Sequence, residues 1–180
     1  PLHQISIGIK VAKAVAEAPG KEYNPFYLCS GAGLGKTHLM NAIGNELRKT
    51  HPNLRVGYVS ATRFSQQVTE SAAHGKLGDF RDRYCRYDIL LLDDLHFLEG
   101  RRQAQEELVH VFDAFCYEER QLVMAGDRPP DEVPELERSL ASRFAGGIVA
   151  SLRPPEWEAR MQILQYLART AGVQIPDDIL

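Results

Sequence analysis

A glycine-rich run with the spacing of a phosphate-binding loop lies near the start of the chain, Ser30-Gly31-Ala32-Gly33-Leu34-Gly35-Lys36-Thr37. In such a loop backbone N–H groups approach phosphate oxygens, the lysine contacts the β- and γ-phosphates, and the threonine hydroxyl binds Mg²⁺. The strict pattern begins with glycine, and Ser30 in its place is also small. The run predicts that these residues, with His38 after them, bind ATP or ADP with Mg²⁺. An incidental glycine turn is the alternative, but it explains neither the strand expected before the loop nor the helix expected after it.

Two consecutive acids, Asp93 and Asp94, follow an apolar run that has the pattern of a buried strand. An acid at the end of a neighbouring buried strand completes the Mg²⁺ site of a phosphate-loop protein, which predicts that Asp93 and Thr37 share the metal. Asp94 is then placed to orient or deprotonate an attacking water. Its side chain is one methylene shorter than a glutamate, so we expect slow hydrolysis. Alone, the pair fits a solvated turn at a strand end equally well.

Apolar periodicity predicts the elements that position these residues. Helices are expected over 5–17, 37–49, 102–117 and 156–171, with two more between 61 and 87 that divide near 74–75. Strands are expected over 26–29, 55–60, 88–93, 121–125 and 148–150. Strands that alternate with helices indicate an α/β fold, in which helices cover both faces of a parallel sheet and ligands bind at the carboxyl ends of the strands.

Composition narrows the functional classes. The 180 residues are 44% hydrophobic and carry a formal net charge of −3, which argues against a surface that grips duplex DNA along its whole extent. The 3 cysteines lie far apart and predict neither a disulfide framework nor a zinc site. The absence of a long apolar run predicts a cytoplasmic protein with no membrane span. Because the chain opens on Pro1 without a methionine and stops after a helix-start signal, we expect a fragment of a longer protein.

Blocks over 23–26, 31–39, 91–98, 105–107, 126–130 and 140–144 resemble, in order and spacing, the ATPase domain of the bacterial replication initiator family DnaA, a branch of the AAA+ ATPases. The Lys-Thr-His end of the loop, the Asp-Asp pair and the Asp-Arg-x-Pro stretch separate this family from other phosphate-loop proteins. The resemblance implies an AAA+ P-loop NTPase fold over 1–154, with an initiator-type helical insertion at about 61–87. It also implies that 155–180 begin a truncated helical lid.

The resemblance assigns roles to two further residues. Asp127 is similar to the first sensor residue, which lies between the acid pair and the γ-phosphate. Arg143 is similar to an arginine finger that enters the nucleotide site of an adjacent subunit, which implies a self-oligomer in the ATP form. A planar guanidinium suits a phosphate, and supplying it from a neighbour makes assembly depend on ATP. Pairing of Arg143 with a carboxylate such as Glu137 or Glu135 is the alternative.

The insertion implies contacts with single-stranded and origin DNA. Basic residues there and after the acid pair are the candidate phosphate contacts: Lys76, Arg81, Arg83, Arg86, Arg101 and Arg102. Charges of both signs alternate over 79–84, so a solvated helix face is the alternative. Thr69 and Gln103 stand where the family has an apolar and a basic contact, and Ser139 stands where it has a second basic residue before Arg143.

Other functional hypotheses share the phosphate loop. A paralogue that loads helicase or inactivates the initiator has the same domain, and the rest of the reading frame distinguishes it from an initiator. A small-molecule kinase would phosphorylate a metabolite, and a scaffold would bind nucleotide without hydrolysing it. The resemblance also implies an adenine-contacting segment before the chain, a second arginine sensor and a helix-turn-helix domain after it, a replicative helicase as partner, and a place at the bacterial nucleoid.

Overall fold

A computed structural model describes residues 2–152, 154 and 157–173. Its centre is a five-stranded parallel sheet in the order β2-β3-β4-β1-β5. The strands are β1 (Phe26–Cys29), β2 (Val56–Ser60), β3 (Ile89–Asp93), β4 (Gln121–Gly126) and β5 (Ile148–Ser151). The inner strands β1, β3 and β4 are buried at every position, because helices cover both faces of the sheet. The predicted α/β fold is therefore confirmed.

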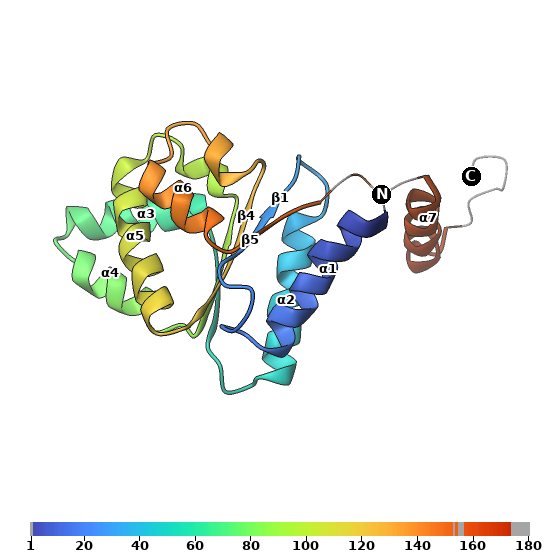
Figure 1. The fold of residues 1–180 in the computed structure, drawn as a ribbon, viewed down its shortest axis with the longest axis horizontal. Helices are drawn as coiled ribbons and strands as arrows, with labels where there is room; N and C mark the ends of the chain where they lie inside the picture. Colours follow the sequence, from blue (N-terminus) through green and yellow to red (C-terminus); the bar gives the residue numbers. More distant parts are fainter. Residues whose placement is uncertain (1, 153, 155–156, 174–180) are drawn as a thin grey trace.

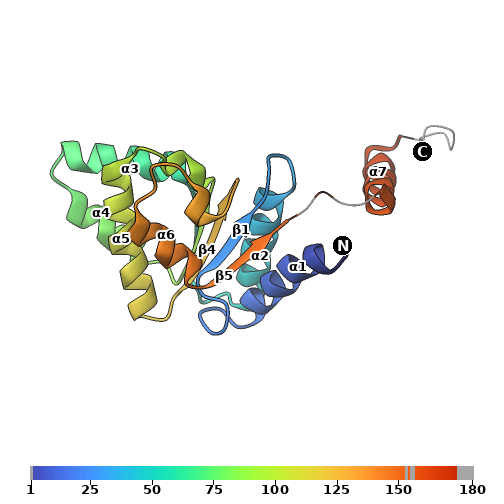
Figure 2. The ribbon, with the colours of Figure 1, turned by 45° about the horizontal axis from the view of Figure 1, so that its top comes forward.

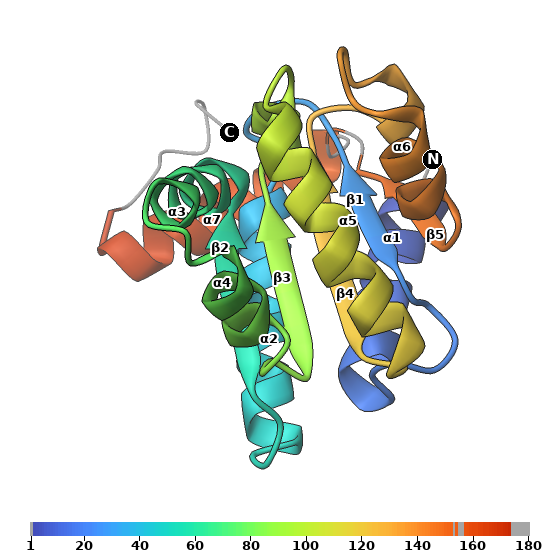
Figure 3. The ribbon, with the colours of Figure 1, turned by 90° about the vertical axis from the view of Figure 1, so that its left-hand side faces the viewer.

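Two helical layers enclose the sheet (Figures 1 and 2). One face carries α1 (Leu2–Glu17) and α2 (Lys36–Thr50). The other carries α3 (Ala61–Ala73), α4 (Leu77–Tyr84), α5 (Arg102–Tyr117) and α6 (Arg138–Ala145). Figure 3 shows α5 crossing in front of β3 and β4, with α1 and α2 behind the sheet. Each face of the sheet thus has its own hydrophobic cluster, and the described helices pack on the faces and not over the carboxyl ends of the strands.

The predicted elements occur with bounds shifted by a few residues at most. The helix pair of the insertion divides at Gly75, whose φ of 66° suits a residue without a side chain. Helix α6 and two 3₁₀ segments, Leu95–Leu98 and Pro130–Glu132, were not expected from periodicity. Helix α6 has only 8 residues and buries only Leu140 and Phe144, which is too few for a helical period to be recognised.

The last described helix, α7 (Trp157–Ala171), lies beyond the end of β5 and apart from the sheet in Figure 1. The predicted start at Glu156 lies outside the described residues. None of the helices in the described ranges is long and apolar enough to cross a membrane.

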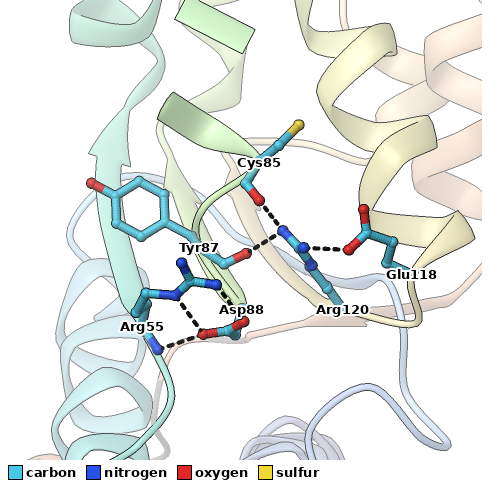
Figure 4. Close-up of polar contacts among 6 residues, drawn as sticks. All are labelled: Arg55, Cys85, Tyr87, Asp88, Glu118 and Arg120. Atoms are coloured by element: carbon cyan, nitrogen blue, oxygen red, sulfur yellow. Dashed lines mark hydrogen bonds and ion pairs between the residues drawn. The ribbon is translucent and has the colours of Figure 1, made fainter. Parts of the chain in front are cut away.

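The amino ends of the central strands are held by two arginines (Figure 4). Arg55 binds Asp88 through Nε at 3.0 Å and Nη2 at 3.1 Å, and its backbone N–H donates to the same carboxylate at 2.8 Å. Arg120 donates to the carbonyls of Cys85 and Tyr87 and pairs with Glu118. These contacts fix the chain where it leaves the insertion and enters β3, so that β3 delivers its last residues to the opposite edge of the sheet.

Candidate nucleotide site

The phosphate loop joins β1 to α2 at the carboxyl edge of the sheet, as predicted. Gly33 and Gly35 have φ values of 75° and 88°, a left-handed conformation that glycine adopts without strain. Gly35 caps α2 and has no side chain to bond the first-turn N–H groups of the helix. Those donors and the positive end of the helix dipole therefore face the loop and can bind an anion.

Lys36 is the first residue of α2 and is only 8% exposed. Its ammonium donates to the carbonyl of Ser30 at 2.6 Å and to that of Gly31 at 3.1 Å. The N–H of buried Ser30 donates to the carbonyl of Gly126 at 3.2 Å, which ties the loop to β4. Serine thus fits the buried start of the loop. The Lys36 ammonium is held by backbone carbonyls of the same loop.

Asp93 ends β3 and is 1% exposed. One carboxylate oxygen, Oδ2, accepts from the Thr37 hydroxyl at 2.8 Å and from the Tyr58 hydroxyl at 2.8 Å. The other oxygen accepts the N–H of Asp94 at 2.8 Å. The structure therefore brings together the two residues predicted to share a metal, and it adds Tyr58, which sequence reasoning missed.

A cavity of about 710 Å³ lies above the loop. Its lining contains the predicted residues of the loop from Gly31 to His38 together with Asp94 and Asp127. Asp94 has a left-handed backbone, with φ 59° and ψ 43°, which turns the chain sharply after β3. Asn41, His96 and Phe97 complete the lining and were not predicted. The Nδ1 atom of His96 is buried and has no hydrogen-bond partner within the described part of the chain.

Asp127 follows β4 and faces this cavity, next to Arg128. The Arg128 guanidinium donates to the two Asp127 oxygens at 3.0 and 2.9 Å. This hydrogen bonding, opposed by partial burial and assisted by the charges of His96 and Arg128, lowers the pKa of the Asp127 carboxyl below its ordinary value. The predicted sensor residue is therefore an anion held at the edge of the cavity.

Arg143 lies on α6 and is not among the residues that line the cavity. Its guanidinium donates to Asp113 on α5 at 2.8 and 3.0 Å and to the carbonyl of Ser139 at 3.2 Å. The partner is thus Asp113, not Glu137 or Glu135. Within one subunit Arg143 is paired on the surface, and its role toward a neighbouring subunit stays a prediction.

The candidate DNA residues lie in different settings. Arg101 and Arg102 are exposed at the start of α5 and line a cavity of about 330 Å³ with Ser65, Thr69, Gln103 and Ala104. Lys76 is exposed between α3 and α4. Arg81 instead donates to the buried carboxylate of Glu107 at 2.6 and 2.8 Å. Arg83 and Arg86 are exposed, and Arg83 donates to the Gln67 side chain at 3.2 Å. Contact with DNA stays a prediction for all six, and Arg81 already has a structural role.

The residues present fit a nucleotide with Mg²⁺. The carboxylate of Asp93 is buried, is bound by neutral donors and touches the Thr37 hydroxyl, so its negative charge is available to a hard cation. Over the described ranges, no cluster of three or more His, Cys, Asp or Glu side chains forms a metal site. A metal here would need oxygens from a nucleotide as well, as Mg²⁺ usually does.

The sheet order, the phosphate loop and the acid at the end of β3 define an AAA+ P-loop NTPase. The family model of the bacterial DnaA ATPase domain matches residues 4–151, which is more than half of the chain. The chain therefore belongs to the bacterial DnaA ATPase-domain family.

Solved structures agree with this assignment. Domain III of the Thermotoga maritima replication initiation protein DnaA is 38% identical with a TM-score of 0.92, over 97% of this chain and 73% of that one. A replication initiator DnaA bound to AMPPCP and single-stranded DNA is 34% identical with a TM-score of 0.89, over 96% of this chain and 53% of that one. This chain thus spans about half the length of that relative.

A more distant similarity is confined to the fold. The DnaC helicase loader is 12% identical with a TM-score of 0.69, over 82% of this chain and 89% of that chain.

Proposed function

We propose that this chain binds ATP with Mg²⁺ and hydrolyses it slowly, as the switch of a DnaA-type replication initiator. The observation that carries the proposal is the 2.8 Å contact between the Thr37 hydroxyl and the Asp93 carboxylate at the N-terminus of α2. The contact unites a phosphate-binding helix end with a buried acid. A DnaA relative bound to AMPPCP, an ATP analogue, supports the choice of nucleotide.

The described residues divide the chemistry between them. First-turn N–H groups of α2 and the Lys36 ammonium bind the phosphates, while Thr37 and Asp93 would hold Mg²⁺, which would neutralise phosphate charge. Asp94 faces the same cavity and orients the attacking water. Asp127, at the end of β4, is the sensor of the γ-phosphate. The short reach of the Asp94 side chain is the reason to expect slow turnover.

Arg143 makes assembly depend on ATP in this proposal. The guanidinium and its partner carboxylate lie on the surface, with side chains 33% and 53% exposed. An exposed pair of this kind contributes about 0–1 kcal/mol, so exchanging Asp113 for a phosphate of the next subunit has a small energetic cost. Supplying the guanidinium from a neighbour joins two subunits only when a triphosphate lies between them.

The assembled form engages single-stranded origin DNA in the bacterial cytoplasm, at the nucleoid, and works with a replicative helicase. Exposed Arg101, Arg102 and Lys76 are the proposed phosphate contacts, at the start of α5 and between α3 and α4. The relative bound to single-stranded DNA supports this ligand. We further assign residues 1–154 to the nucleotide-binding domain, 61–87 to its insertion and 155–180 to the start of a helical lid.

The test compares full-length wild type with Arg143→Ala. Sedimentation in ATP and in ADP measures assembly, and a fluorescent ATP analogue measures affinity. We expect Arg143→Ala to abolish ATP-dependent oligomers while nucleotide affinity changes less than about twofold, because the side chain lies outside its own cavity.

Arg48→Ala is the matched control, since Arg48 is an exposed arginine in the last turn of α2. It should assemble as wild type does. Intact ATP-dependent oligomers in Arg143→Ala would exclude the role in a neighbouring subunit. A wild type that transfers phosphate to a metabolite would instead identify a small-molecule kinase.

A further inference from the structure

Tyr58 contacts the metal-binding acid, although neither its residue type nor its spacing belongs to the phosphate-loop pattern. It lies on β2, one of the two edge strands of the described sheet. Residue Ser60 is the register partner of Asp93, so Tyr58 lies two residues before the end of the strand. Its hydroxyl nevertheless reaches Asp93 Oδ2 at 2.8 Å. The side chain therefore extends along the edge of the sheet toward the nucleotide site.

The ring of Tyr58 has little part in the core. The residue is 44% exposed, whereas Val59 beside it is 6% exposed and belongs to a core cluster. A half-exposed tyrosine contributes modestly through burial, so its specific contribution is the hydroxyl bond to a buried carboxylate. A carboxylate oxygen can only accept a hydrogen bond, so the Tyr58 hydroxyl is the donor in this contact.

The bonds of Asp93 show what the hydroxyl does. The Asp94 N–H holds one oxygen, while Thr37 and Tyr58 share the other. A hydroxyl binds a cation through an oxygen lone pair, so Thr37 can act as a Mg²⁺ ligand and still donate its hydrogen to Asp93. Tyr58 is the second side chain that donates to Oδ2, and it holds the Asp93 carboxylate from β2, the strand beside β3.

We infer that Tyr58 is a positioning residue of the Mg²⁺–nucleotide site, which it serves by holding Asp93 Oδ2 next to the Thr37 hydroxyl. The inference rests on the proposed function. Removing a hydrogen bond that a neighbouring side chain makes to a metal ligand typically lowers metal affinity about 10- to 100-fold.

The experiment measures binding of a fluorescent ATP analogue with Mg²⁺ and with EDTA. The ratio of the two affinities is the gain due to Mg²⁺. We expect Tyr58→Phe, which keeps the ring, to reduce this gain about tenfold while affinity in EDTA stays within about twofold of wild type. Tyr117→Phe is the matched control, because Tyr117 is 90% exposed at the end of α5, and it should keep the full gain.

A double-mutant cycle separates positioning from a general loss of structure. If the hydroxyl acts through Asp93, Tyr58→Phe should have no further effect on the gain in an Asp93→Asn background. An undiminished gain in Tyr58→Phe, or additive effects in the cycle, would overturn the inference while leaving nucleotide binding intact. A wild type that gains nothing from Mg²⁺ would overturn the inference together with the proposed function.

Discussion

The two ends of strand β3 carry the same residue type in opposite electrostatic settings. Asp88 precedes the strand and is bound by the guanidinium of Arg55, so its charge is neutralised (Figure 4). Asp93 ends the strand and is bound by two hydroxyls and one backbone N–H. No lysine or arginine pairs with Asp93 in the part of the chain that the structure describes.

This difference separates a structural acid, Asp88, from Asp93, the acid that we propose binds Mg²⁺. A buried carboxylate that has hydrogen bonds but no counter-ion can still attract a cation, whereas a carboxylate bound by a bidentate arginine is already paired. Hence substitutions at the amino edge of the sheet should change stability and leave nucleotide affinity alone. Substitutions at the carboxyl edge should do the reverse.

The largest effect is expected for Lys36→Ala. Losing charged hydrogen bonds worth about 1.5–3 kcal/mol should weaken ATP binding about 10- to 150-fold. Binding of a fluorescent ATP analogue measures the change. Lys49→Ala, on the same helix with a side chain 76% exposed, should bind as wild type does. Equal affinities for the two variants would contradict the assignment of the loop.

A loss of stability without loss of binding is expected for Arg120→Ala. The Arg120 side chain is 20% exposed, and its removal leaves the carbonyls of Cys85 and Tyr87 without this donor. The free energy of unfolding in urea should fall by about 2 kcal/mol. Exposed Arg86, in the same segment, gives the control Arg86→Ala, which should change by less than about 0.5 kcal/mol. Weaker nucleotide binding in Arg120→Ala would contradict the expectation that the amino edge of the sheet affects stability alone.

A smaller loss is expected for Arg81→Ala, which tests whether a candidate DNA residue is structural. Its partner Glu107 has a side chain 5% exposed and would be left without its cation, while the Arg81 side chain itself is 41% exposed. We expect about 1–2 kcal/mol less stability in urea unfolding, because the partly exposed pair is screened by solvent. Lys76→Ala should keep full stability and lose affinity for single-stranded DNA. If Arg81→Ala instead kept its stability and lost affinity for single-stranded DNA, Arg81 would be the DNA contact.

The smallest effect concerns pH. Hydrogen bonding by Arg55 lowers the pKa of the Asp88 carboxyl, against the opposing effect of burial. A depressed folded-state pKa stabilises the protein above the unfolded value of about 3.9, and this stability is lost as pH falls through the folded value. Wild type should therefore have a higher Tm than Asp88→Asn at pH 7. The difference in Tm should shrink below about pH 4. A difference independent of pH would show that the charge is not responsible.

Local patterns were enough to predict most of the fold. Every strand of the described sheet coincides with a short apolar run in the sequence. Helix α5 was predicted at its observed bounds because many buried positions repeat at helical spacing along it. Helix α6 was missed because two buried residues do not define a period. The phosphate loop and Asp93 were predicted to meet because the carboxyl ends of parallel strands lie at one edge of the sheet. The acid was expected on a strand next to that of the loop, whereas β4 lies between β1 and β3.

What the sequence by itself determined is the type of chemistry: a glycine loop, a lysine, a threonine and an acid that suit a nucleotide with Mg²⁺. Only the tertiary structure decided the partners of the charged and polar side chains. Tyr58 meets Asp93, and Arg81 meets Glu107, across 35 and 26 residues of chain. Such pairs depend on how strands and helices align in space, and side-chain spacing along one segment carries no information about that alignment.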